Sequence, residues 1–122
     1  MATVYSPPKG FEAPAITMED YRDQRWEAIE AEYIERLAAC ARDVQRSEPD
    51  PIIGKVVRFP YADGYAQYLV WSVRPLQLVH LDLGDGWAIP DAHARGLRLT
   101  DIRAMVKADE ALASFLGRKV EA

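Results

Sequence analysis

The sequence has little of what several common protein classes require. Cys40 is the only cysteine among 122 residues, which excludes an intrachain disulfide and any zinc site built on several thiolates. No apolar run approaches the roughly 20 residues that span a bilayer, and the first residues lack the basic region and apolar core of a secretory signal. We therefore expect a cytoplasmic location.

Recognisable catalytic motifs are also missing. There is no Gly-x-Ser-x-Gly turn for a nucleophilic serine, and the run Gly84-Asp85-Gly86 lacks the lysine and hydroxyl residue of a phosphate-binding loop. Cys40 lies on the apolar side of a predicted helix, where a thiol is usually inert packing. These absences favour a protein that is not an enzyme and that holds no cofactor.

The sequence also lacks an excess of positive charge. The formal net charge is −4 and the isoelectric point is about 5.1, whereas a nucleic-acid-binding domain usually carries a basic patch or an isoelectric point above about 9. Direct nucleic-acid binding is therefore disfavoured. The composition, 49% hydrophobic and 28% charged, is otherwise that of a small soluble domain, and the length suits one domain.

What is present begins with an arm and a long helix. Residues 1–16 contain three prolines and no periodic pattern, which predicts an extended N-terminal arm. Thr17 is a good helix cap, and apolar residues then recur at spacings of three and four up to Val44, which predicts one amphipathic helix over residues 17–47. Its helical turns, from about residue 18 to 46, would be about 43 Å long. Because that exceeds the width of so small a domain, part of its apolar stripe must cover the sheet, meet the C-terminal helix or meet another chain. We expect docking on a larger protein or on a second copy.

The pattern changes to alternation after Pro51, and it predicts a sheet over residues 52–90. The expected strands are 53–59, 65–73, 76–83 and 87–89, joined by tight turns. The run from Gly54 to Pro60, with the turn and aromatic strand that follow, is similar to the way in which small SH3-like barrels begin. This resemblance is one of fold pattern over about 40 residues, and it implies no particular ligand.

A second helix is expected over residues 100–117, capped by Thr100 and stopped by Gly117. The predicted fold is therefore α+β: residues 17–122 form one domain with a four-stranded antiparallel meander or small SH3-like barrel between two helices. The predicted core consists of Trp26, Ile29, Tyr33, Leu37, Val57, Phe59, Leu69, Trp71, Val79, Leu81, Ile102, Met105, Val106, Leu112 and Leu116.

The leading functional hypothesis is a non-enzymatic protein-binding module. The acidic side of the first helix and an aromatic and arginine-lined part of the sheet are its candidate surfaces. The candidate partner-binding residues are Glu27, Glu30, Glu32, Tyr33, Arg58, Tyr65, Trp71 and Arg74.

Three alternatives stay open at this point. An inhibitor encoded by a phage or plasmid could block a host nucleic-acid-handling complex by presenting helix carboxylates in place of phosphates, although Arg22, Arg25 and Arg36 interrupt the acidic run. A barrel could bind single-stranded nucleic acid through Tyr65, Trp71, Arg58 and Arg74. A small metal-dependent enzyme could use two imidazoles and two carboxylates, namely His80, Asp82, Asp85 and His93.

Overall fold

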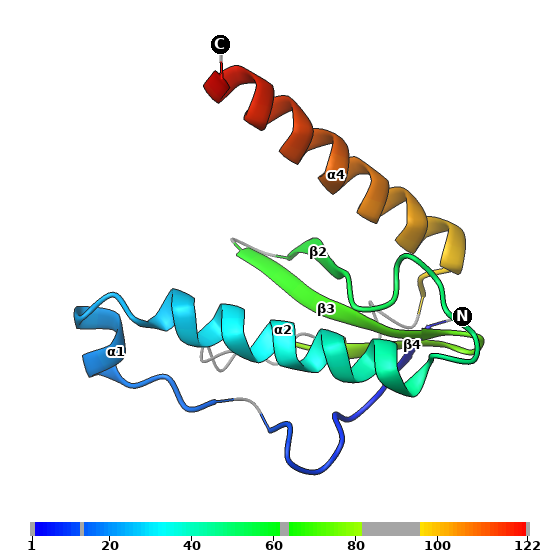
Figure 1. Cartoon of the computed structure of the whole chain (residues 1–122), viewed down its shortest axis with the longest axis horizontal. Helices are drawn as coiled ribbons and strands as arrows, with labels where there is room; N and C mark the ends of the chain where they lie inside the picture. Colours follow the sequence, from blue (N-terminus) through cyan, green and yellow to red (C-terminus); the bar gives the residue numbers. More distant parts are fainter. Residues whose placement is uncertain (1, 13, 62–63, 82–95, 122) are drawn as a thin grey trace.

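The computed structural model describes residues 2–12, 14–61, 64–81 and 96–121, and it has the predicted α+β fold (Figure 1). Two helices precede most of the sheet and one follows it. The elements in chain order are β1 (Thr3–Val4), α1 (Met18–Arg22), α2 (Trp26–Val44), β2 (Val56–Tyr61), β3 (Gly64–Val73), β4 (Leu76–His80) and α4 (Leu99–Glu121).

The sheet is mixed and open, so the prediction of an antiparallel meander or closed barrel is wrong in part. The strand order is β1-β4-β3-β2, with antiparallel pairs β2–β3 and β3–β4 and a parallel pair β1–β4. Its fourth strand, β1, comes from the N-terminal arm. The sequence did not predict this strand, because two residues are too few to show alternation. The strand expected at residues 87–89 lies outside the described residues.

The N-terminal arm is held along its length. The Ala2 N–H donates to the Leu97 carbonyl over 3.0 Å, and the Tyr5 N–H donates to the Leu78 carbonyl over 2.7 Å. The Tyr5 ring stacks on Trp71 with ring centres 5.2 Å apart. Further along, the Tyr33 hydroxyl donates to the Phe11 carbonyl over 2.9 Å, and burial raises the pKa of Tyr33. The arm therefore covers aromatic residues that would otherwise face solvent.

The single helix predicted over residues 17–47 is wrong, because the chain leaves the helical conformation at Gln24. Thr17 caps α1 as expected, in a reciprocal capping box with Asp20. Gln24 then has a φ of 57°. The Arg25 N–H donates to the Asp20 carbonyl and the Gln24 N–H to the Tyr21 carbonyl, which is the Schellman closure of a helix end. The sequence does not reveal this break, because no glycine or proline occurs between Met18 and Glu48.

The separate helix α2 has 19 residues and is therefore about 28 Å long. A helix of this length fits across the sheet, and its length alone no longer requires a second chain. The helix length therefore no longer supports docking or self-association through the first helix, which stays a prediction.

The break predicts a stabilising substitution. Gln24→Gly should raise the free energy of unfolding by about 0.5–1 kcal/mol, because a residue with a β-carbon pays a steric penalty at positive φ that glycine avoids. Chemical denaturation followed by far-ultraviolet circular dichroism measures the difference. Gln45→Gly is the control; Gln45 has a φ of −94°, so glycine relieves no strain there. Equal effects at the two positions would contradict the account.

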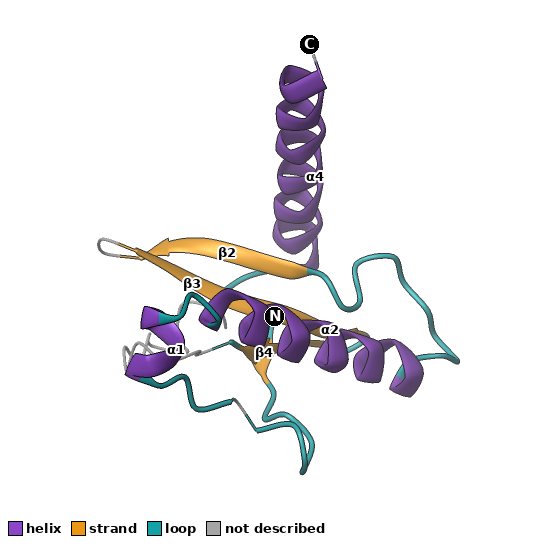
Figure 2. Ribbon diagram, turned by 60° about the vertical axis from the view of Figure 1, so that its left-hand side comes forward, coloured by secondary structure: helices purple, strands orange, loops and turns teal. Residues whose placement is uncertain are grey.

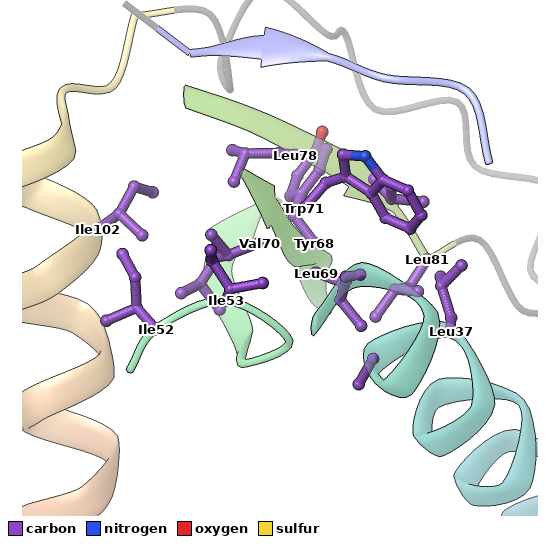
Figure 3. Close-up of a cluster of buried hydrophobic side chains, with 14 of the residues drawn as sticks. Leu37, Ile52, Ile53, Tyr68, Leu69, Val70, Trp71, Leu78, Leu81 and Ile102 are labelled. Atoms are coloured by element: carbon purple, nitrogen blue, oxygen red, sulfur yellow. The ribbon is translucent and has the colours of Figure 1, made fainter. Parts of the chain in front are cut away.

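The core lies on both faces of β3, as its aromatic pattern predicts. Leu37 of α2 lies near Leu69 and Leu81 on one side of the sheet, while Ile102 of α4 lies near Ile52 on the other (Figure 3). Confirmed core residues are Tyr33, Leu37, Val57, Leu69, Trp71, Val79, Leu81, Ile102 and Val106.

The remaining core predictions divide into three groups. Trp26, Ile29 and Met105 are only partly buried. Leu112 is 57% exposed, so its place in the core is wrong. The side chains of Phe59 and Leu116 lie outside the described residues. Tyr68, Val70 and Leu78 are buried but were not predicted, because both faces of β3 and β4 are covered and alternation selects only one face. Ile53, in the turn before β2, is also buried and was not predicted.

Helix α4 begins one residue before Thr100 and continues through Gly117 to Glu121, so both predicted ends are corrected. The Arg98 N–H donates to Asp101 Oδ2 over 2.9 Å and closes the first turn. Arg103 donates from Nη1 and Nη2 to Asp50 over 3.0 and 2.7 Å. This ion pair fixes the start of α4 to the loop that follows α2.

The ion pair also predicts a pH dependence. Its hydrogen bonds from Arg103, together with one from the Ile52 N–H, hold the pKa of Asp50 below its usual value. A lowered pKa in the folded state stabilises the protein above the unfolded value of about 3.9, and this contribution is lost as pH falls through the folded value. Thermal unfolding of Asp50→Asn should therefore show less loss of stability below pH 4 than the native chain. Identical pH profiles would contradict the assignment.

Candidate binding groove

A groove of about 700 Å³ runs between α2 and the β2–β3 pair. We call it the α2–β2 groove. The helix wall consists of Trp26, Glu27, Glu30, Ala31, Ile34, Glu35, Ala38 and Arg42, and the sheet wall consists of Gly54, Val56, Arg58 and Gln67.

Local sequence explains why this space is open. Val56 and Arg58 are two apart on β2, so both project from the same face of the sheet, and their partners on β3 are Leu69 and Gln67. Alanines at positions 31 and 38 of α2 line the groove. Because these side chains are short, the helix does not fill the space above β2.

Gly54 brings the start of β2 against α2. Its φ is 87°, its N–H donates to the Val70 carbonyl, and the Val70 N–H donates to the Lys55 carbonyl. Gly54 and Lys55 thus lie opposite the single residue Val70, as in the type of β-bulge whose first residue is a glycine at positive φ. A β-carbon here would lie 3.2 Å from Ala38 Cβ and 3.3 Å from the Ala38 carbonyl oxygen. Position 54 therefore requires glycine for its backbone conformation and for its contact with the helix.

The bulge also determines which backbone groups of β2 point outward. The Val70 N–H donates to the Lys55 carbonyl, so Lys55 and every second residue after it form hydrogen bonds with β3. The residues between them, Val56 and Arg58, therefore direct their N–H and C=O groups away from β3. Within the described part of the chain, β2 ends the sheet and no strand pairs with its outer side. Pro60 is the next outward position and has no N–H. The open edge is therefore short and lies beside the groove.

The groove carries both signs of charge. Glu27, Glu30 and Glu35 come from α2, while Arg42 and Arg58 come from opposite walls. Among the described residues, Arg42 and Arg58 form no ion pair within 4 Å. Both guanidinium groups are exposed, so they are available to a carboxylate of a ligand.

The structure brings together three of the eight predicted partner-binding residues: Glu27, Glu30 and Arg58 all line the groove. Tyr33 and Trp71 are 7% and 3% exposed, so neither forms a binding surface, and Trp71 cannot stack on a nucleic-acid base without leaving the core.

The other three predicted residues are not part of the groove as described. Glu32 is exposed but does not line the groove. Arg74 follows the end of β3, about 23 Å along the strand from Gln67. The side chain of Tyr65 lies outside the described residues.

Other groove residues were missed. Val56 and Gln67 each precede a buried residue of their strand, Val57 and Tyr68, so a sheet-face argument could have found them, whereas Trp26 was assigned to the core. The proximity of Arg42 to Gly54 depends on the bulge, which alternation does not reveal.

Three of the four predicted metal ligands lie outside the residues that the structure describes. His80 is the last residue of β4, and its ring stacks on Tyr68 with centres 4.9 Å apart. Asp82, Asp85 and His93 lie outside the described residues. Within the described ranges there is no cluster of three or more residues able to hold a metal ion.

Comparison with known proteins gives no matching family model, no matching curated protein and no matching solved structure. Of the helices in the described ranges, none has the length and apolarity needed to cross a membrane. The functional argument therefore rests on the α2–β2 groove.

Proposed function

We propose that the protein is a binding module that takes up an extended segment of a larger protein along β2. The observation that carries this proposal is the position of the outward N–H and C=O groups of Val56 and Arg58 beside the α2–β2 groove. A segment added to β2 as a further strand would satisfy these groups, and its alternate side chains would enter the groove.

The groove suggests the chemistry of such a segment. Groove-facing side chains of an added strand are about 6.7 Å apart, which matches the spacing of Gly54, Val56 and Arg58 along the sheet wall. Beside Val56 an apolar side chain is favoured, and beside Arg58 a carboxylate is favoured. The carboxylates of Glu27 and Glu35 on the helix wall favour a basic residue. The segment is therefore short, and it carries an apolar residue, a carboxylate and a basic residue.

Arg58→Pro tests strand addition without removing a hydrogen bond of the sheet, because the Arg58 N–H points away from β3. The probe is a library of random 12-residue peptides displayed on phage and selected on the native protein. We expect the best peptide to bind Arg58→Pro at least tenfold more weakly. Arg58→Ala is the matched control, because it keeps the outward N–H and should lose less affinity.

Two results would overturn this proposal. One is that Arg58→Pro and Arg58→Ala weaken the selected peptide equally while both stay folded. The other is that the library gives no peptide whose binding depends on residues of the groove.

The alternatives have less support in the described residues. An inhibitor that presents carboxylates in place of phosphates needs unpaired acidic groups, but Asp20 and Asp23 both lie within 3.5 Å of the Arg25 guanidinium. A metal-dependent enzyme would rest on His80 alone within the described residues. We therefore retain strand addition as the proposed function.

A further inference from the structure

The C-terminal half of α4 extends beyond the sheet (Figures 1 and 2). The helix has 23 residues and is about 34 Å long. Ile102 and Val106 in its first half are buried, and Glu110 still reaches Lys55 with a 3.7 Å ion pair. Beyond this point Leu112 is 57% exposed. Helices gain most of their stability from the packing of an apolar face, so a partner that covers Leu112 would stabilise this half.

The sequence of this half is complementary to itself when read in the reverse direction. If two copies of the helix run antiparallel with Ser114 at the centre, residues equally far from Ser114 lie level with each other. Each charged residue from Lys107 to Glu121 is then level with one of opposite sign. The level pairs are Lys107 with Glu121, Asp109 with Lys119, and Glu110 with Arg118.

The apolar positions follow the same symmetry. Leu112 of one copy is level with Leu116 of the other, and these two positions are four apart, on one helix face. Asp109 precedes Leu112 by three residues and Lys119 follows Leu116 by three, so both belong to the same face. Lys107, Glu110, Arg118 and Glu121 occupy positions on the opposite side of the helix, so the Asp109–Lys119 pairs are the charge pairs of the shared face.

We infer that a second copy of this chain pairs with the projecting half of α4, antiparallel and centred on Ser114. A parallel pair would place Asp109 beside Asp109 and Lys119 beside Lys119 of the partner, and it would align the two helix dipoles unfavourably. A two-fold interface requires a surface that is complementary to itself, and this segment meets that requirement. The pair replaces the first helix as the expected site of self-association.

The arrangement does not depend on the proposed function. Each domain lies at the start of its own α4, so an antiparallel pair places the two domains at opposite ends of the paired helices. None of the side chains of α4 that the structure describes lines the α2–β2 groove, so both grooves stay accessible in the dimer. Failure of the dimer would leave the groove proposal intact, and the reverse also holds.

Sedimentation equilibrium between about 5 and 200 μM tests the inference. We expect the native chain to be a dimer at the upper concentrations and Leu112→Asp to be a monomer throughout. Met18→Asp is the control, because Met18 is 84% exposed on α1 and should leave the dimer unchanged. Far-ultraviolet circular dichroism verifies that the variants stay folded. A monomeric native chain, or a Leu112→Asp variant that dimerises normally, would overturn the inference.

A charge exchange tests the orientation. Asp109→Lys and Lys119→Asp should each weaken dimerisation several-fold, and the double variant should return to within about twofold of the native chain. These positions are ten residues apart in one helix, about 15 Å, so rescue requires the second copy. Single variants without effect, or a double variant weaker than either single one, would contradict the antiparallel register.

Discussion

Leu37→Ala is expected to lower the free energy of unfolding by about 3 kcal/mol, within the range of about 2–5 kcal/mol found for large-to-small changes in a core. Leu37 is fully buried at the middle of α2 and lies near Leu69 and Leu81 (Figure 3). Its removal leaves a cavity where the helix rests on the sheet, and this contact holds the helix wall of the α2–β2 groove. Urea denaturation followed by tryptophan fluorescence measures the loss.

Val44→Ala is the matched control on the same helix. Val44 is near the end of α2 and is exposed, so its truncation should change the free energy of unfolding by less than about 0.5 kcal/mol. If the two substitutions cost the same, α2 would not be docked through Leu37, and the groove would not exist in the form described.

Gly54→Ala is expected to cost about 2 kcal/mol or more. The backbone term is about 1–2 kcal/mol, because the φ of 87° is unfavourable for any residue with a β-carbon. The new methyl group would also meet Ala38 at 3.2 Å, which requires α2 and the start of β2 to separate. Arg42 is also close, but its side chain is flexible and can move aside.

Gly10→Ala separates these two contributions. Gly10 has a φ of 96°, and a β-carbon there would meet nothing within 4 Å. The control therefore carries the backbone cost alone, and the difference between the two variants measures the contact with α2. Equal losses in urea denaturation would mean that Gly54 serves only the bulge and does not limit the approach of the helix.

The parts of the fold that are local in sequence could be predicted. The Thr17 cap is confirmed, and so is the aromatic pattern that places β3 inside the sheet. Tyr33 and Leu37 are confirmed as core residues because the helical stripe through α2 is strong. These features depend on neighbours within a few residues, where periodicity and capping chemistry are informative.

The parts that depend on distant contacts could not be predicted. Strand β1 has only two residues, so its pairing with β4 produces no alternation in the sequence. The helix break at Gln24 is not marked by a glycine. Leu112 has the right spacing for a core residue but lies where α4 has passed the end of the sheet. Tyr33 and Trp71 were predicted both as core and as partner-binding residues, and only the long-range contacts of the N-terminal arm, from Phe11 to Tyr33 and from Tyr5 to Trp71, decide between the two.

Hydrogen exchange at β2, measured by nuclear magnetic resonance, tests the central claim most directly. In the free protein, the outward amides of Val56 and Arg58 should exchange rapidly while the Val57 amide, which bonds to β3, is protected. Saturation with a peptide selected from the library should slow exchange at Val56 and Arg58 by at least tenfold. Unchanged exchange at both amides in the saturated complex would contradict strand addition to β2.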